Sequence, residues 1–526
     1  MKKSVLQYLL ILSTSLSMAQ TTFQKAYGGF AFEQGNFIQQ TADSGFIVAG
    51  TTSSFGEGGS DIYLIKTTAS GDSVWTKTYG GIDNEYGFCV QQTADGGYIV
   101  SGVTPSFADV AGDFYLIKTN ALGDTLWSRT YGGSGLEWGL YVQQTFDGGY
   151  ILTGQTPAFG AGAWDLYLIK TDTTGNISWT KTYGGSSSEF GYAVQQTADS
   201  GFIISGEMSS YGAGSGDVYL IKTDVSGNTI WTKTYGGTDE EIGLSVKQTT
   251  DGGYIVAGYT YSFGLGNKEA YLIKTNASGT LVWSKTYGGI EWDDCNAVVQ
   301  SSDGGYALVG TSRSFSAGGD YDMYLIKTDT LGNILWTKTY GGTDNEYGFS
   351  IANTFDGGYI LSGSTSSFSA GFDDVYLVKT DANGNSGCHQ GTTTTILNSP
   401  FTGTFIPPAT VSSGGTSALP ATAVHSGATK TNICSTSVDL SEINPVTTVL
   451  IYPNPFFDQA QLSIQSTMKA ESITLCNIFG QIVKIIPVNN RAIIQLHADE
   501  LPAGVYLYKI SGEDTAVLAF GKIVIQ

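Results

Sequence analysis

The architecture of this 526-residue chain can be deduced from the stretch Val90–Tyr131, which reads VQQTADGGYIVSGVTPSFADVAGDFYLIKTNALGDTLWSRTY. It holds four short runs rich in β-branched and aromatic residues, each bounded by Gly, Asp or Asn. The connections Asp-Gly-Gly at 95–97 and Asn-Ala-Leu-Gly at 120–123 are typical of turns between antiparallel strands. We therefore expect four strands, at residues 90–93, 98–103, 113–119 and 125–131.

The same pattern recurs seven times along the chain. The tripeptide Tyr-Gly-Gly returns five times after 52 residues and once after 53, and it begins at Tyr27, Tyr79, Tyr131, Tyr183, Tyr235, Tyr287 and Tyr340. Repeats of about 40–50 residues that contain four short strands are typical of β-propeller blades. The spacing therefore predicts an all-β fold with a seven-bladed β-propeller over residues 20–388.

The two ends of the repeat region complement each other. A tryptophan marks the fourth strand of six units, at Trp75, Trp127, Trp179, Trp231, Trp283 and Trp336. The seventh unit ends at Cys388 without one, whereas Phe23–Tyr27 reads like Trp75–Tyr79. We therefore expect the N-terminal strand to complete the last blade, because such closure leaves no sheet edge open.

The composition excludes several classes of function. The formal net charge is −21 and no basic cluster occurs, whereas phosphate binding needs clustered cations, so nucleic acid is not an expected partner. The only histidines, His389, His425 and His497, all follow the repeats. Histidine-based triads and histidine-ligated metals are therefore excluded from the first 388 residues.

The N-terminus is typical of an exported protein. Residues 1–19 combine Lys2 and Lys3, the apolar run Leu6–Leu12 and a small-residue cleavage site at Ser17–Ala19, which predicts a signal peptide. No other apolar run approaches the roughly 20 residues that cross a bilayer, so we expect no transmembrane segment. The mature chain is expected to be a monomer, secreted or held at the cell surface after Sec-dependent export to the periplasm.

The composition changes after the repeats. Residues 389–446 are rich in Thr, Ser, Gly, Ala and Pro, which predicts a linker. Cys388 and Cys434 flank most of this stretch, and a disulfide between them would stabilise the fold by about 4 kcal/mol; the alternative is two free thiols. Alternating apolar residues resume in 447–526 and predict six short strands in a small β-sandwich.

Four motifs occur in order within residues 447–526. Their central residues are Tyr452, Pro453, Asn454, Pro455, Gly480, Leu501, Pro502, Gly504 and Tyr506, and Gly521–Val524 follows. The segment resembles the type A C-terminal sorting domain of the type IX secretion system of Bacteroidota. The resemblance implies that residues 447–526 are recognised by the type IX machinery at the outer membrane, and that the cargo is released or anchored at the cell surface.

A second resemblance concerns the repeats. The hairpin at residues 172–179, which ends in Trp179, resembles the tryptophan-docking repeat of quinoprotein-type propellers. The quinone-dependent enzymes carry a vicinal cysteine pair that this chain lacks. The resemblance therefore implies a propeller architecture without the quinone chemistry.

Polar side chains recur at fixed positions in every unit. Besides two lysine positions and one amide position, a carboxylate follows each Tyr-Gly-Gly, at Glu33, Glu85, Glu137, Glu189, Glu241, Asp293 and Glu346. We interpret these positions as inter-blade hydrogen bonds, because the acid and base of an active site need different environments. The alternative is a carboxylate-lined axial channel that holds Ca²⁺, the one cofactor that the sequence leaves open.

The symmetry of the repeats breaks on the face that carries the long loops. The candidate ligand-binding residues there are Tyr86, Trp138, Trp164, Trp292, Asp293, Asp294 and Tyr347. Aromatic faces beside carboxylates suit sugar rings, although they also suit packing between blades. We expect a non-catalytic module that binds a polysaccharide or a surface protein. The alternative is an exported carbohydrate-active enzyme that uses the carboxylate pair Asp293 and Asp294.

Overall fold

The computed structural model contains strands and turns, and no helix among the residues that it describes. These residues are 20–108, 111–316, 318, 321–400, 403–405, 410–412, 416–418, 423–425, 429–436, 447–452, 458–466, 470–477, 482–488, 493–498, 501, 504–512 and 517–525. The expected signal peptide, residues 1–19, lies outside them. The chain divides into two compact units, Met1–Ser437 and Val438–Gln526.

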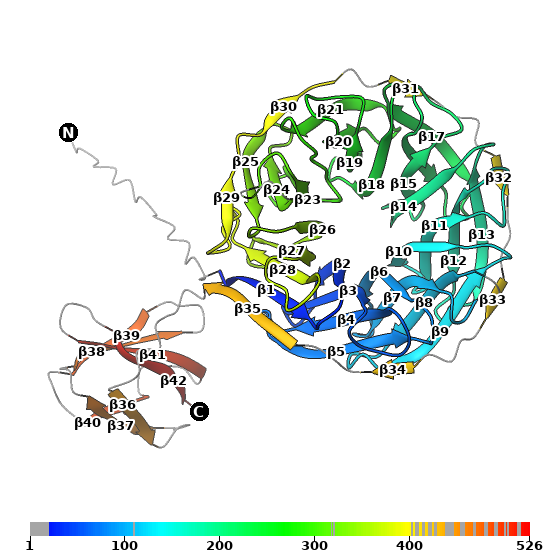
Figure 1. Cartoon of the computed structure of the whole chain (residues 1–526). Coiled ribbons are helices and arrows are strands. Elements are labelled where there is room, and N and C mark those ends of the chain that lie inside the picture. Colours follow the sequence, from blue (N-terminus) through cyan, green and yellow to red (C-terminus); the bar gives the residue numbers. More distant parts are fainter. Residues whose placement is uncertain are drawn as a thin grey trace, which may run out of the picture. The chain divides into compact units, whose positions relative to one another are not determined.

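The first unit repeats one antiparallel sheet, in which the chain runs outward from a central axis (Figure 1). From the inner to the outer strand, six sheets contain β2 (Glu33–Gln40), β3 (Phe46–Thr52), β4 (Asp61–Thr67) and β5 (Ser73–Gly80); β6 (Tyr86–Gln92), β7 (Tyr98–Thr104), β8 (Asp113–Thr119) and β9 (Thr125–Gly132); β10 (Trp138–Gln144), β11 (Tyr150–Thr156), β12 (Asp165–Thr171) and β13 (Ile177–Gly184); β14 (Glu189–Gln196), β15 (Phe202–Met208), β16 (Asp217–Thr223) and β17 (Thr229–Gly236); β18 (Glu241–Gln248), β19 (Tyr254–Thr260), β20 (Glu269–Thr275) and β21 (Leu281–Gly288); and β22 (Ala297–Gln300), β23 (Tyr306–Ser312), β24 (Asp322–Thr328) and β25 (Ile334–Tyr340). The predicted all-β architecture of repeated four-strand units is confirmed, and it is consistent with a propeller.

The seventh sheet joins the two ends of the repeat region. It contains β26 (Glu346–Asn353), β27 (Tyr359–Thr365) and β28 (Asp374–Thr380), followed by β1 (Thr22–Gly28). β1 pairs antiparallel with β28, so that Lys25 lies opposite Leu377. Phe23 takes the place of the fourth-strand tryptophan. Its ring lies against Gly71 of the next sheet, as the ring of Trp75 lies against Gly123.

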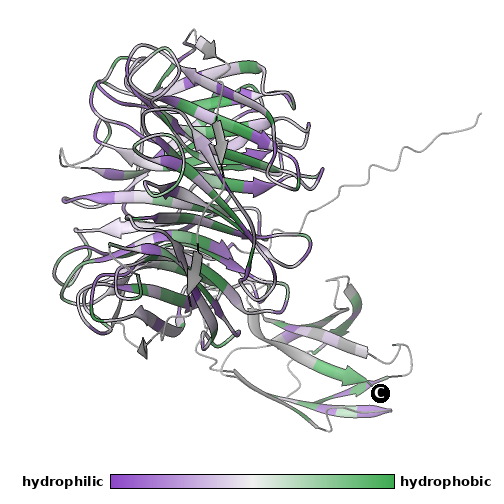
Figure 2. Cartoon of the chain, turned by 90° about the vertical axis from the view of Figure 1, so that its right-hand side faces the viewer, coloured by the Kyte–Doolittle hydropathy of each residue, from purple (hydrophilic) through white to green (hydrophobic). Residues whose placement is uncertain are grey.

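The sheets are held together by apolar packing and by one recurring hydrogen bond. The second and third strands of each sheet are buried almost throughout, since both of their faces lie against neighbouring sheets, and Figure 2 shows hydrophobic residues on many strands of the chain. The tyrosine of Tyr-Gly-Gly is fully buried, and its hydroxyl donates to a turn in the next sheet, as from Tyr79 to the Gly123 carbonyl at 2.6 Å. The repeated tyrosine therefore joins neighbouring sheets.

The stretch expected to be a linker contains seven short strands. We call them the belt strands: β29 (Gln390–Thr392), β30 (Ile396–Asn398), β31 (Gly403–Phe405), β32 (Thr410–Ser412), β33 (Thr416–Ala418), β34 (Ala423–His425) and β35 (Thr429–Thr436). In this order they pair with β25, β21, β17, β13, β9, β5 and β1, and so cover the outer strand of every sheet in turn (Figure 1). Outer edges expose unpaired backbone groups, which the belt strands satisfy.

A disulfide joins the two ends of this covering segment. Cys388, at the end of the last repeat, bonds to Cys434 in β35 across 46 residues of sequence. The Gln24 side chain in β1 donates to the hydroxyl of Ser386 at 2.7 Å and to the Cys388 carbonyl, so that the junction also contacts the first strand. Cys89 and Cys295 are free and buried.

The second unit contains one sheet of three strands and one of four. Their bounds are β36 (Thr447–Tyr452), β37 (Gln459–Ser466) and β40 (Ile493–His497), and β38 (Ala470–Asn477), β39 (Ile482–Pro487), β41 (Gly504–Gly512) and β42 (Val517–Ile525). Leu462, Ile473 and Tyr506 belong to one buried core that both sheets share. Of the expected sorting residues, Tyr452, Leu501, Gly504 and Tyr506 are described, whereas Pro453, Asn454, Pro455, Gly480 and Pro502 lie outside the described residues.

Candidate functional site

The inner strands surround an axial cavity of about 230 Å³. In six of the seven inner strands a β-bulge follows the first glycine, as between Gly139 and Tyr141 in β10, and its extra residue breaks the strict alternation of side chains. Two consecutive residues of one strand therefore reach the axis. The first of these positions lines the cavity with Asn36, Phe88, Leu140, Tyr192, Leu244, Asn296 and Phe349. These residues lie near the strand ends that follow the long loops.

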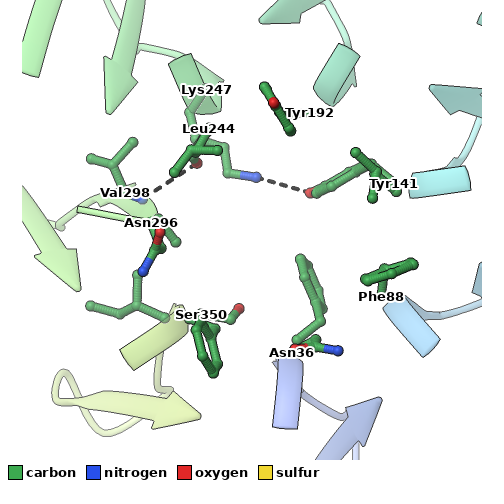
Figure 3. A pocket seen from close by; sticks show the side chains of 15 residues that line it. Asn36, Phe88, Tyr141, Tyr192, Leu244, Lys247, Asn296, Val298 and Ser350 are labelled. Atoms are coloured by element: carbon green, nitrogen blue, oxygen red, sulfur yellow. Dashed lines mark hydrogen bonds between the residues drawn. The ribbon is translucent and has the colours of Figure 1, made fainter. Parts of the chain in front are cut away.

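Three side chains narrow the axis below this cavity. The Lys247 ammonium donates a hydrogen bond to the Tyr141 hydroxyl at 3.1 Å, and Figure 3 shows the two side chains pointing toward one another. Phe37 contacts Tyr141 edge-on, with ring centroids 5.6 Å apart. All three also line a second cavity of about 240 Å³, with Gln39, Gln91 and Gln143. They therefore separate two chambers along the axis.

Lys247 brings a positive charge to this constriction. Burial opposes that charge, whereas Tyr141 and Cys89 favour it, and together they hold the pKa of Lys247 above its ordinary value. The neighbouring Cys89 thiol is neutral, because burial raises its pKa to about 12. Among the described residues that line the upper cavity, Lys247 is the only charged one. The site therefore presents an ammonium among aromatic, amide and hydroxyl groups.

The aromatic residues expected to bind ligand form three separate groups. Tyr86 and Trp138, from neighbouring inner strands, stack with centroids 6.3 Å apart, and Trp138 also contacts Phe88 of the cavity wall. Trp164 packs on Phe190 at 6.4 Å. Tyr347 stacks between Tyr321 and the cavity residue Phe349. Phe190 in turn contacts the cavity residue Tyr192 with centroids 6.4 Å apart, so all three groups are continuous with the cavity wall.

The structure does not assemble Asp293 and Asp294 into a pair of free carboxylates. Asp293 is fully buried and accepts hydrogen bonds from the Gly289 amide at 2.7 Å and the Ser314 hydroxyl at 2.6 Å. Asp294 forms an ion pair with Lys268 at 2.8 Å. Trp292 between these loops is 42% exposed. Both carboxylates therefore hold loops in place.

The repeated polar residues connect strands and turns. Seven lysines each pair with an aspartate in a turn of their own sheet at 2.8–3.0 Å, and they are Lys66, Lys118, Lys170, Lys222, Lys274, Lys327 and Lys379. The amides instead link neighbouring sheets, as when Gln92 accepts from the Ala42 amide at 2.8 Å. The inter-blade interpretation is therefore right for the amides and for the second lysine position, where Lys77 pairs with Asp124 of the next sheet at 2.7 Å, whereas these seven lysines act within a sheet.

The recurring carboxylates lie where neighbouring sheets meet and not along the axis, as the inter-blade interpretation expects. All seven are fully buried, and Glu33 accepts from the Gly29 amide and the Thr52 hydroxyl. A second carboxyl group lies beside each of them. Asp61 and Glu85, for example, both lie so close to Gly80 that a Cβ atom there would meet both side chains. Burial and the charge of Glu85 raise the pKa of Asp61 to about 7. No group of three or more metal-ligating residues occurs within the described ranges.

Sequence reasoning did not single out Tyr141 and Lys247. The available signal was the break in the repeat: Gln39, Gln91, Gln143 and Gln195 stand where this one unit has Lys247. Lys247 is also one of three cations of the repeat region outside the two lysine positions, with Lys268 and Arg313. A cation at a position that four other units fill with glutamine therefore marks the site.

The second unit gives the clearest family relationship. Residues 450–526 match the secretion system C-terminal sorting domain, so the predicted type IX sorting domain is confirmed. Such a domain implies interaction with the type IX secretion machinery and export to the cell surface or into the medium. In the described part of the chain, no helix is both long and apolar enough to cross a membrane.

The remaining similarities are weaker. The regulatory protein FlaEY of Caulobacter vibrioides is 26% identical over 225 residues, which cover 38% of this chain and only 23% of that protein. PorZ, a surface component of the type IX secretion system of Porphyromonas gingivalis, has a TM-score of 0.37 at 10% identity, covering 95% of this chain and 60% of PorZ. The extracellular domain of BT4673 from B. thetaiotaomicron has a TM-score of 0.40 at 9% identity, covering 97% and 60%.

Proposed function

We propose that this chain is a secreted or cell-surface β-propeller of seven blades that binds a polysaccharide without catalysis. The pairing of β1 with β28 supports closure of the ring by the N-terminal strand. In this proposal residues 1–19 direct Sec-dependent export to the periplasm, and the machinery then recognises residues 447–526. The sorting domain supports this route.

One observation carries the binding role. Aromatic side chains gather where the inner strands meet the long loops, and the stacked pair Tyr86 and Trp138 continues through Phe88 into the axial cavity. Flat aromatic faces next to polar groups are the surfaces on which sugar rings stack. A rigid scaffold with varied loops at one face is also the usual arrangement of a recognition module.

The test is a polysaccharide panel, with and without Ca²⁺, that scores bound chain and released reducing ends together. We expect binding without release, and Trp138→Ala should weaken it at least tenfold because it removes the stacked face. Leu122→Ala is the matched control, since Leu122 is 65% exposed in a short turn at the opposite strand ends. A panel without any binding, or equal effects of the two substitutions, would contradict the proposal.

A second candidate is a glycoside hydrolase-like enzyme, which one observation favours. Burial and the charge of Glu240 raise the pKa of Glu207 to about 7, so that at neutral pH Glu207 carries its proton part of the time beside the charge of Glu240. Glycoside hydrolysis needs two carboxyl groups in these two states. Release of reducing ends that Glu207→Gln abolishes would move this function ahead of simple binding.

A further inference from the structure

The position of Lys247 breaks the repeat at the axis. Four units have glutamine at the equivalent position, and the other two have Val299 and Ala352. A bulge position nearby varies as well: only Tyr141 there has a hydroxyl on an aromatic ring, whereas other units have Phe37 or a small residue such as Ser245. The two exceptional side chains come from sheets that are not neighbours, and yet they meet across the axis (Figure 3). An arrangement that only filled space would not require an ammonium.

The partners of Lys247 leave its charge uncompensated. Its hydrogen bond goes to a neutral phenol, and none of the ion pairs among the described residues includes it. By contrast, Lys268 pairs with Asp294, and the repeated Lys66 pairs with Asp43. Burial still opposes a charge that has no counter-ion, and an anionic ligand would offset that part of the cost.

The hydrogen-bonding geometry matches a carboxylate. The ammonium has further protons to donate, and the Tyr141 hydroxyl, which accepts from Lys247, retains its own proton. Two donors side by side suit the two oxygens of one carboxylate, and charge-assisted hydrogen bonds are the stronger kind. The absence of Asp and Glu from the described lining of this cavity means that no protein carboxylate competes.

The rest of the cavity suits a sugar ring. Phe88, Tyr192 and Phe349 supply apolar faces. Asn36 and Asn296 donate through their amide nitrogens to the Gly87 and Gly348 carbonyls, and no hydrogen bond among the described residues uses their amide oxygens. Those oxygens can accept from ligand hydroxyls. A volume of about 230 Å³ lies just below the usual range of ligand pockets, so it suits one sugar unit.

We propose that the axial cavity binds the carboxylate of a uronic acid, with the Lys247 ammonium and the Tyr141 hydroxyl as its donors. The proposal deepens the binding function above and rests on it, because it names the acidic sugar that enters from the aromatic face. The ligand is either a free uronate or the end of an acidic polysaccharide, since both present the same group.

The experiment is calorimetric titration of the full chain with galacturonate, galactose and trigalacturonate at constant ionic strength. Galactose is the matched neutral probe, because it differs from galacturonate only in the oxidation of one carbon. We expect galacturonate to bind at least tenfold more tightly than galactose. A further gain with trigalacturonate would identify a chain end as the ligand, and equal affinity a free uronate.

Three variants test the donors. Lys247→Gln introduces the residue of the equivalent units and should abolish the preference for galacturonate. Tyr141→Phe, which has a precedent at Phe37 in the same repeat position, should weaken binding by less, because a neutral donor contributes less than a charged one. Arg313→Gln removes one exposed charge and should leave the affinity unchanged.

The outcomes separate this proposal from the broader one. Equal binding of galacturonate and galactose, no binding of either, or an unchanged preference in Lys247→Gln would overturn the carboxylate site. Neutral polysaccharides that bind through Trp138 would then still support the broader function. Conversely, Lys247-dependent binding of free galacturonate, with no polysaccharide bound, would retain the site and refute the polysaccharide module.

Discussion

Breaking the disulfide between Cys388 and Cys434 should destabilise the first unit without removing any strand. The bond closes a loop of 46 residues, and in the chain-entropy model a loop of that length restricts the unfolded chain enough to stabilise the fold by about 4 kcal/mol. The double variant Cys388→Ser, Cys434→Ser should lose about that much free energy of unfolding. The belt strands then keep their pairing with the outer strands, which is three residues long in six of the seven.

Two measurements check this expectation. Denaturant unfolding of the oxidised chain and of the double variant gives the free-energy difference directly. Limited trypsin digestion reports local release, because Lys430 in β35 is the only Lys or Arg between the two cysteines. Its backbone pairs with Tyr27 of β1, so cleavage there requires β35 to leave β1, and we expect it to be much faster in the variant.

The control is reducing agent, which should reproduce the effect in the parent chain and do nothing to the double variant. Cys89 and Cys295 are already free, so the agent has no other disulfide to reduce among the described residues. A loss below about 1 kcal/mol, with unchanged digestion at Lys430, would refute the reasoning. It would mean that backbone pairing alone holds the belt strands.

Three further predictions concern single side chains. Asp61 loses its proton near its ordinary pKa in the unfolded chain and only near pH 7 in the folded chain, so the free energy of unfolding should fall as the pH rises from about 4 to 7. In thermal denaturation, Asp61→Asn should recover up to about 4 kcal/mol at pH 8 and little at pH 4. A change that does not depend on pH would contradict this. Gly123→Ala should lower the free energy of unfolding more than Gly96→Ala, because both glycines have φ near +80° but only a Cβ at position 123 would meet Trp75. The strained backbone conformation alone costs about 1–3 kcal/mol in either variant. Equal losses of stability in urea unfolding would show that the contact with Trp75 contributes nothing. Asp293→Asn should cost about 1–3 kcal/mol of stability and so lower the melting temperature, without changing any release of reducing ends. If the variant instead stopped such release and kept its melting temperature, Asp293 would have a catalytic role.

The repeat positions could be predicted because each carries a side chain with one physical task. The tyrosine of Tyr-Gly-Gly, the fourth-strand tryptophan and the following carboxylate recur at fixed spacing, so the strands that bear them follow from the sequence. The belt strands escaped prediction because they are short and pair mainly through their backbones, although Leu397 of β30 also packs against the core. Strands of three residues rich in Thr, Ser and Ala show no apolar alternation that would distinguish them from a linker.

The site was predictable in part, for a related reason. Tyr86 and Trp138 were found because they are large aromatic exceptions to the repeat, and the structure places them together. Asp293 was misleading because it stands next to Trp292, which is exposed. Adjacent residues of an extended chain point to opposite sides, so the exposure of Trp292 accompanies the burial of Asp293. Lys247 required knowledge of which strand position faces the axis, and the bulge that determines this leaves no mark in the composition.

The belt strands also bear on how this protein can evolve. Tandem repeats of 52 residues are prone to duplication and loss through unequal recombination, and many repeat proteins vary in length for that reason. Here a segment that is not itself repeated contributes one strand to each of the seven sheets and returns to Cys388. A chain with one unit more would leave an outer edge uncovered, and a chain with one fewer would carry a surplus strand. The covering segment thus ties the number of units to a length encoded elsewhere in the gene.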